Sequence, residues 1–111
     1  MIKITIVKES ENLITIEATG HSGYAESGSD IICSAVSTLT QNCEKALSEM
    51  LKIKHEFVID EKTPYILINL SYELDKKSMH DAQIIMKSTY IGLKDLANSY
   101  PKFINIKEKR K

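Results

Sequence analysis

The stretch from residue 20 to residue 37, GHSGYAESGSDIICSAVS, constrains this chain more than any other. Three of the chain's four glycines fall in its first nine residues: Gly20, Gly23 and Gly28. Glycine enters positive-φ conformations without steric cost, so this density predicts an irregular loop. Ser29 and Asp30 then predict a helix start, with a small polar N-cap followed by an acidic residue in the first turn.

The loop and the helix start each carry a residue suited to nucleophilic catalysis, His21 and Cys33. Unpaired backbone N–H groups and the helix dipole favour a thiolate over a thiol, although Asp30 opposes this. The same N–H groups are candidate oxyanion donors, and a nearby imidazole can take the thiol proton. A structural interpretation stays open, because most cysteines are small buried side chains and most loop histidines are merely solvated.

Composition is that of an ordinary soluble globular protein, with 42% hydrophobic and 27% charged residues, and residues 1–111 are expected to form one domain. The 15 basic and 15 acidic side chains balance, so we expect no general binding to nucleic acid or anionic membranes. No apolar run approaches the roughly 20 residues of a membrane span. The N-terminal segment MIKITIVKES alternates like a strand, so a cytoplasmic protein with reduced cysteines is expected.

Hydrophobic periodicity predicts strands and helices in the order ββαββαβ. The expected elements are strands through residues 2–6 and 14–19 around a turn at 8–12, a helix over 30–51, strands over 55–60 and 65–72 around a turn at 60–64, a helix over 76–99, and a strand over 103–107. Strands that come in hairpins give a mostly antiparallel sheet on which both helices can pack. The sequence therefore predicts an α+β fold with a frayed, solvated basic tail at 107–111.

The apolar stripe of the first predicted helix separates the two cysteines. It comprises residues 32, 35, 36, 39, 43, 46, 47 and 50. At 100° per residue, Cys43 lies near the middle of this stripe and Cys33 lies roughly 100° from its centre. Cys43 is thus expected in the core, whereas Cys33 is expected at the border with solvent, partly shielded and reachable.

The second predicted helix has its own stripe at residues 82, 85, 86, 89, 93, 96, 97 and 100, with Asp75 or Ser78 as its cap. Pro101 ends this helix. Ile84 and Ile91 lie seven residues apart on the opposite face. They indicate either a surface for self-association or ordinary exposed apolar residues.

Residues 20–23 (GHSG), Gly28 and residues 30–37 (DIICSAVS) resemble the signature of the ribosomal-processing cysteine protease family, Prp. That signature is a GHAG-like loop followed by a helix start similar to G-x-D-I-V-C-A-A-V-S. Ser22, Ile32 and Ser34 stand where alanine, valine and alanine are common in the family. None of these changes removes a reacting group.

The resemblance implies a small bacterial cytoplasmic endopeptidase without cofactor or metal. Members of the family are dimeric and remove an N-terminal extension from the precursor of the large-subunit ribosomal protein L twenty-seven, cutting after paired aromatic residues. By match of position, His21 is the general base and Cys33 the nucleophile, with Asp30 and Ser37 in supporting positions. The resemblance assigns a substrate loop to Gly20, Ser22, Gly23, Tyr24 and Gly28. We expect residues 22–29 to be mobile until substrate binds.

Three other functions are alternatives to proteolysis. A non-catalytic ribosome-associated binding module would use the basic tail and the exposed isoleucines and would need no nucleophile. Thiol redox activity is not expected, because the chain has no C-x-x-C motif. A zinc site is not expected either, because the histidines and cysteines lack the close spacing of zinc ligands. The residues concerned are His21, Cys33, Cys43, His55 and His80.

Overall fold

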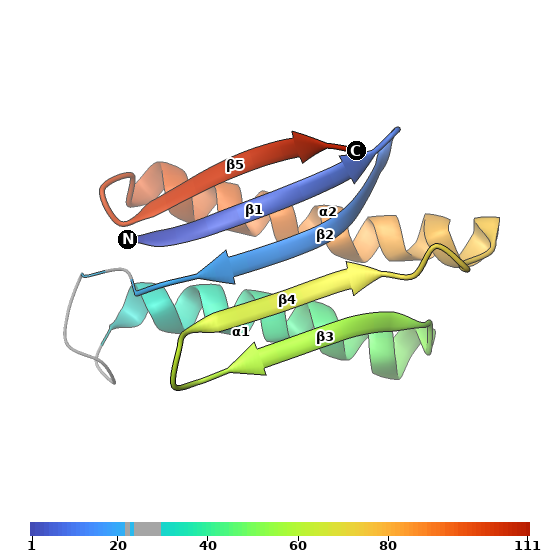
Figure 1. The fold of residues 1–111 in the computed structure, drawn as a ribbon, viewed down its shortest axis with the longest axis horizontal. Coiled ribbons are helices and arrows are strands. Elements are labelled where there is room, and N and C mark those ends of the chain that lie inside the picture. The colour runs from blue at the N-terminus through green and yellow to red at the C-terminus, as the bar shows by residue number, and fades with distance from the viewer. Residues whose placement is uncertain (22, 24–29) are drawn as a thin grey trace.

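The expected order of elements is confirmed in a computed structural model that describes residues 1–21, 23 and 30–111 (Figure 1). The elements are β1 (Ile2–Glu9), β2 (Asn12–Thr19), α1 (Ile31–Lys45), the π-helical η1 (Ala46–Leu51), β3 (His55–Asp60), β4 (Tyr65–Leu70), α2 (Lys76–Ser99) and β5 (Ile104–Arg110). η1 continues α1 directly, so the two together span the region predicted as one helix.

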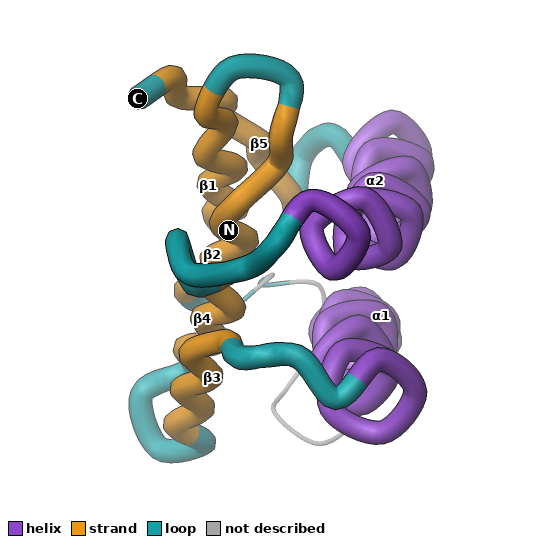
Figure 2. Tube along the Cα trace, turned by 90° about the vertical axis from the view of Figure 1, so that its right-hand side faces the viewer, coloured by secondary structure: helices purple, strands orange, loops and turns teal. Residues whose placement is uncertain are grey.

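The five strands form one mixed sheet in the order β3-β4-β2-β1-β5. The pairs β3/β4, β4/β2 and β2/β1 are antiparallel, whereas β5 runs parallel to β1. Both helices lie on the same face of the sheet, as the edge-on view in Figure 2 shows. The predicted α+β class with a mostly antiparallel sheet is therefore confirmed, and one face of the sheet is left without a helix.

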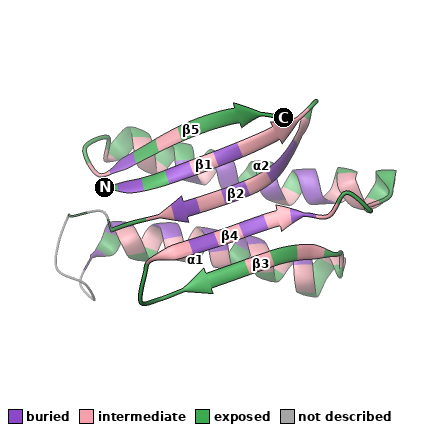
Figure 3. Ribbon diagram, viewed as in Figure 1, coloured by how far each residue is buried: buried purple, intermediate pink, exposed green. Residues whose placement is uncertain are grey.

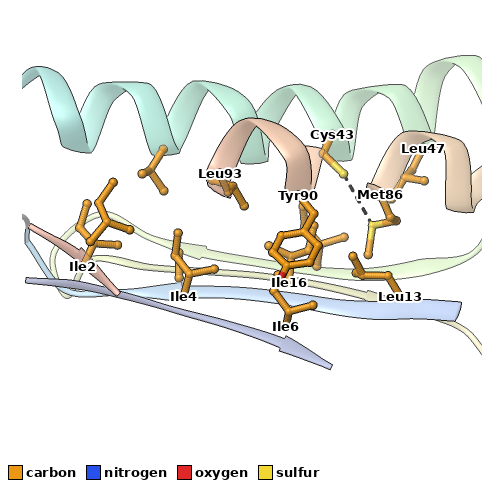
Figure 4. Close-up of a cluster of buried hydrophobic side chains, with 14 of the residues drawn as sticks. Ile2, Ile4, Ile6, Leu13, Ile16, Cys43, Leu47, Met86, Tyr90 and Leu93 are labelled. Carbon is orange, nitrogen blue, oxygen red and sulfur yellow. Dashed lines mark hydrogen bonds between the residues drawn. The ribbon is translucent and has the colours of Figure 1, made fainter. Parts of the chain in front are cut away.

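Alternating strand residues build the core between the sheet and the helices (Figure 4). From β1, Ile2, Ile4 and Ile6 point toward the helices, as their period of two predicts. Cys43 of α1 is 1% exposed and packs in this cluster, in agreement with its place on the predicted stripe. Other fully buried side chains of the same cluster are Ile32, Leu13, Ile16, Leu47, Ile68, Leu70, Met86 and Leu93.

The first hairpin is tighter than predicted and contains a bulge. Its strands extend to Glu9 and begin again at Asn12, which leaves only residues 10 and 11 for the turn. The register passes from Val7–Thr15 to Lys8–Leu13, so the bulge lies between these pairs. This shift turns Leu13 into the core. The predicted alternation had placed only the even-numbered residues of this strand there.

The Gln83 side chain of α2 binds the main chain beside this bulge. Its Oε1 accepts the N–H of Leu13 at 2.6 Å, and its Nε2 donates to the carbonyl of Leu13 at 3.0 Å. Gln83 was not predicted to be buried, because an amide in a helical pattern is ordinarily assigned to the solvent face. The buried N–H and carbonyl of Leu13 both need a hydrogen-bond partner. This need, which arises beside the bulge, explains why the amide side chain of Gln83 is buried.

The predicted stripe of the first helix is wrong at its end. Met50 is 73% exposed, although the stripe placed it in the core. The wider turn of η1 changes the angle between successive residues after Lys45, and the 100° step no longer applies. Within α1, Thr40 is buried although the predicted stripe left it out, and its hydroxyl donates to the carbonyl of Val36 at 2.9 Å.

The later elements begin close to where they were predicted, and two of the strands end elsewhere. α2 has the predicted bounds, and the side chain of Asp75 caps it by accepting the N–H of Ser78 at 2.8 Å. The expected frayed tail is wrong, because β5 continues to Arg110 through parallel pairing with β1. The fourth strand ends at Leu70 rather than at residue 72.

Candidate active site

A cavity of about 240 Å³ lies between the start of α1, the ends of β1 and β2 that face it, and the β3–β4 turn. The four residues that the sequence singled out for catalysis and its support all line this cavity: His21, Asp30, Cys33 and Ser37. They come from the residue after β2 and from the first turns of α1. The fold therefore brings a thiol and an imidazole to one concave surface.

Asp30 determines where α1 begins. Its Oδ1 accepts the N–H groups of Ile32 and Cys33, each at 3.0 Å, and the residue is only 5% exposed. Asp30 is thus the N-cap itself, not the first-turn acid that was expected after a Ser29 cap; Ser29 lies outside the described residues. A carboxylate satisfies two first-turn donors at once, which gives a physical reason for the cap to lie here.

This capping bears on the expected oxyanion donors. The N–H groups of Ile32 and Cys33 donate to the Asp30 carboxylate, and the N–H of Ser34 donates to the carbonyl of Asp30 at 3.1 Å. These amides are therefore satisfied by Asp30 in this conformation. An oxyanion could use the amides of Ile32 and Cys33 only if the Asp30 carboxylate released them.

Cys33 lies at the border between the core and the cavity. Its side chain is half-buried and packs against the hydrophobic cluster, while the residue also lines the cavity. This matches the flank position predicted from the helical stripe. A substrate carbonyl in the cavity could reach the thiol. The first turn of the helix, which carries this thiol, is held by Asp30.

Gly20 sets the direction in which the chain leaves β2 and carries His21, an exposed residue, to the cavity. Its φ is +90°, and an added Cβ would lie 2.8 Å from the carbonyl oxygen of Met1. Its N–H donates to the carbonyl of Pro64 at 3.0 Å. Conformation and space thus both require glycine here, and the hydrogen bond to Pro64 holds the end of β2 against the β3–β4 turn.

The predicted substrate loop is described only in part. Gly20 and Gly23 both have positive φ, +90° and +78°. Ser22, Tyr24 and Gly28 lie outside the described residues, as does most of the segment expected to be mobile.

Ser37 and Gln41 make a polar wall one and two turns along α1 from Cys33. Gln41 Nε2 donates to Ser37 Oγ at 2.6 Å, and both residues line the cavity. Gln41 was not predicted as a site residue. Its spacing of four residues from Ser37 is the signal that could have identified it.

The end of β3 and the β3–β4 turn form another wall of the cavity, which was not predicted. The lining residues are Ile59 and Asp60 at the end of β3, and Glu61 and Pro64 in the turn. The pairing of Thr19 with Tyr65 between β2 and β4 brings the turn beside Gly20. Such a long-range pairing has no local signal in the sequence.

Tyr65 at the start of β4 also lines the cavity, and its hydroxyl faces Glu17 of β2. The hydroxyl donates to Glu17 Oε2 at 2.7 Å, and this hydrogen bond to a carboxylate raises the pKa of Tyr65 to about 12. Tyr65 therefore stays protonated at neutral pH. It supplies an uncharged aromatic wall, not a general base.

The other cysteine and one other histidine lie together elsewhere and do not line this cavity. Cys43 Sγ is 3.6 Å from Met86 Sδ, and burial raises the pKa of the Cys43 thiol. The ring of His55 contacts Glu44 Oε2 at 2.9 Å through Nε2 and the carbonyl of Ile53 at 2.8 Å through Nδ1. A buried thiol that resists ionisation, near an imidazole committed to other partners, is unsuited to nucleophilic attack.

The described residues contain no group of three or more His, Cys, Asp or Glu side chains placed to hold a metal ion. Within that same part of the chain, no helix has the length and apolar character needed to cross a membrane.

Comparison with known proteins identifies the family. The sequence model described as cysteine protease Prp matches residues 1–105. The ribosomal processing cysteine protease Prp of Mycoplasma pneumoniae is 32% identical over 111 residues, which cover 100% of this chain and 98% of that protein. The protein of the same name from Bacillus subtilis is 24% identical over 101 residues, 90% of each chain.

Solved structures have the same fold. A crystal structure of a Streptococcus mutans protein is 34% identical, covers 100% of this chain and 96% of its own, and has a TM-score of 0.86. The Staphylococcus aureus ribosomal processing protease Prp, solved with a covalently linked product peptide, has a TM-score of 0.87 at 20% identity, over 98% of this chain and 100% of its own. With a family model matched over almost the whole chain, this protein belongs to the cysteine protease Prp family.

Proposed function

We propose that this protein is the endopeptidase that removes the N-terminal extension of the bacterial large-subunit ribosomal protein L twenty-seven, and so supports ribosome assembly. The observation that carries the proposal is a cavity lined by both Cys33 and His21 at the capped start of α1. Relatives named ribosomal processing proteases support the substrate class. The family's preference for an extension ending in paired aromatic residues supplies the specific substrate.

Cys33 is the nucleophile and His21 the general base in this proposal. The His21 imidazole accepts the thiol proton, and the sulfur attacks the scissile carbonyl to form a tetrahedral intermediate. The C–N bond then breaks, and the imidazolium returns its proton to the leaving amine, which leaves a thioester on Cys33. Water, deprotonated by His21, hydrolyses that thioester and restores the thiol.

The neighbouring residues support these two. Asp30 holds the first turn that carries Cys33, and Ser37 contributes to the polar wall of the cavity. Gly20 and Gly23 belong to the segment that would contact the substrate, with Ser22, Tyr24 and Gly28. The chemistry requires no metal or cofactor. We further propose that residues 1–111 act as one catalytic domain, in the cytoplasm and as a homodimer.

Cleavage of the organism's own L twenty-seven precursor tests the proposal. Purified Cys33→Ala and His21→Ala should leave the precursor uncut under conditions in which the unaltered protein removes the extension completely, as measured by intact-protein mass spectrometry. Cys33→Ser keeps the size of the side chain but has a far less acidic nucleophile, and it should lose nearly all activity.

The same variants separate proteolysis from a non-catalytic binding module. A binding module would capture the precursor in a pull-down and leave it intact whether or not Cys33 is present. Full cleavage by Cys33→Ala would overturn the assignment of the nucleophile. An intact precursor with the unaltered, folded protein would overturn the proposed substrate.

A further inference from the structure

The cavity that holds Cys33 extends along one flank of α1. Cys33, Ser37 and Gln41 follow one another at steps of four residues, and all three line the cavity. Residues four apart are neighbours on the surface of a helix, so these side chains form a row along that flank. At about 1.5 Å of rise per residue, the row carries the cavity about 12 Å from Cys33 to Gln41.

This flank of α1 faces the edge strand β3. Farther along the same flank, Glu44 Oε2 and Ser48 Oγ contact His55 Nε2 of β3 at 2.9 Å and 3.3 Å. Ile59 lies four residues after His55 in the strand, so it points to the same face of the sheet and lines the cavity. In the edge-on view of Figure 2, α1 lies level with β4 and β3. The cavity therefore occupies a groove between α1 and β3, which the contacts of His55 bridge at one end.

This α1–β3 groove is apolar at its base and polar along the helix. Val36 and Ile66 line it and are 4% and 8% exposed, so they form its base. Ile59 pairs with Ile66 in the sheet but is 40% exposed, which shows that α1 does not cover it. Ser37 and Gln41 supply the polar side. A chain lying in the groove would thus meet both apolar contacts and hydrogen-bonding groups.

The Gln41 amide has hydrogen-bonding capacity beyond its contact with Ser37. One N–H of Nε2 is used by the bond to Ser37 Oγ at 2.6 Å. The second N–H and Oε1 have no hydrogen bond within the part of the chain that the structure describes. Gln83 shows how such an amide is used in this fold, because it binds both the N–H and the carbonyl of Leu13. An extended peptide residue likewise presents its N–H and carbonyl on one side.

We propose that the substrate peptide extends from Cys33 along the α1–β3 groove, and that Gln41 is a specificity-determining residue that binds the main chain of the peptide there. This inference rests on the proposed peptidase function. An extended chain advances about 3.3 Å per residue, so the groove places this contact about three or four residues from the scissile bond. Because Gln41 binds main-chain groups, it selects for the length and extended conformation of the substrate.

Peptides that span the cleavage site test the inference with the variant Gln41→Leu. Leucine is close to glutamine in size and favours helix, but it has no donor or acceptor. The long peptide has about six residues on each side of the scissile bond, beyond the expected contact, and two series shorten it one residue at a time from either end. The matched control is Asn42→Leu, since Asn42 is an exposed amide of the same helix that does not line the cavity.

We expect Gln41→Leu to lower kcat/KM for the long peptide about three- to tenfold, mainly through KM, which is the size of one or two neutral hydrogen bonds. In one of the two series, peptides too short to reach Gln41 should be cut equally by both proteins. Asn42→Leu should match the unaltered protein on every peptide. An equal loss at every length would overturn the inference, because Gln41 would then act on Cys33 through Ser37. An unchanged rate at every length would overturn it as well.

Ester replacements in the long peptide locate the main-chain contact. An ester in place of one peptide bond removes a single N–H and leaves every side chain unchanged. In the unaltered protein, an ester about three or four residues from the scissile bond should lower kcat/KM, and in Gln41→Leu this penalty should disappear. No penalty in the unaltered protein, or the same penalty in both, would overturn the role of Gln41. If the unaltered protein cuts neither the long peptide nor the intact precursor, the proposed function itself has failed.

Discussion

A single carboxylate, that of Asp30, fixes the helical position of Cys33 by accepting its N–H and that of Ile32. Ser and Asp have similar preferences for the N-cap, so the sequence Ser29-Asp30 could not decide between them. The structure assigns the cap to Asp30 and places Cys33 at the third helical position. The same bond occupies an amide that was expected to be available to an oxyanion, which a motif alone does not reveal.

Cys43 gives a prediction that separates packing from chemistry. Cys43→Ala removes a fully buried sulfur and should lower the free energy of unfolding by about 1–2 kcal/mol, because the surrounding core relaxes only in part. Cleavage of the precursor per folded molecule should be unchanged. Urea denaturation and the precursor assay measure the two quantities on the same preparation.

Alkylation provides an independent comparison of the two thiols. In the folded protein, iodoacetamide should modify Cys33 and leave Cys43 unmodified, because burial both shields Cys43 and raises the pKa of its thiol. Peptide mapping by mass spectrometry identifies the modified residue. Loss of cleavage in a fully folded Cys43→Ala variant, together with activity in Cys33→Ala, would reverse the assignment of the nucleophile.

At the scale of elements, a polar cluster joins the end of α1 and η1 to β3. Glu44 Oε2 contacts His55 Nε2 at 2.9 Å and also accepts a hydrogen bond from the Ser48 hydroxyl. The bond from Ser48, followed by the contact with His55, lowers the pKa of Glu44. A carboxyl whose pKa is lower in the folded state stabilises the fold above its ordinary pKa, and this contribution is lost as the pH falls through the folded-state value.

Glu44→Gln should therefore be less stable than the unaltered protein at neutral pH, by about 1 kcal/mol for a partly exposed charged hydrogen bond. The difference should shrink below about pH 4, where the carboxyl of the unaltered protein is itself protonated. Urea denaturation at several pH values measures it. Exposed Glu49→Gln in η1 is the control, and a Glu44→Gln deficit that stays constant with pH would show that packing, not charge, is responsible.

The elements that the sequence predicted well are those whose boundaries depend on local signals alone. α2 has an Asp75 cap, one apolar stripe and Pro101 after its end, and its bounds were predicted correctly. The errors arise where a distant part of the chain decides the outcome. Parallel pairing with β1 orders the tail through Arg110, and the bulge beside Leu13 requires the buried amide of Gln83.

The residues of the candidate site likewise fall into two groups: those with a local sequence signal, and those placed by pairing with a distant part of the chain. Cys33, Asp30 and Ser37 lie within eight consecutive residues on one helix start, so a motif could place them together. His21, which the same motif predicted as the partner of Cys33, follows β2 and lines the same cavity next to Gly20. Another wall, with Asp60, comes from the end of β3 and the turn after it, about thirty residues later, and depends on sheet pairing. It could not be predicted from periodicity, which reports local conformation only.

At the scale of the molecule, the sheet and the pair of helices form two layers, and the outer surfaces of these layers have different properties. The bare sheet face carries half-buried polar pairs such as the Thr15 hydroxyl bonded to Asn69 Oδ1 at 2.6 Å. Exposed residues alternate with buried ones along α2 (Figure 3), and the exposed ones form its outer face. On it, Ile84 and Ile91 are 60% and 66% exposed and lie two turns apart. Two large apolar side chains in register are the feature of this face best suited to contact another chain.

If the protein is a dimer as proposed, light scattering at micromolar concentration should report about twice the 12.6 kDa mass of the chain. Ile84→Glu with Ile91→Glu should then shift the mass toward that of the monomer, because burying two carboxylates against a partner is costly, while each remains harmless on an exposed helix face. Met50→Glu, a change at another exposed apolar residue, should leave the mass unchanged. A monomer in the unaltered protein would refute the dimer. A dimer that survives the double substitution at full stability would assign the interface to another surface.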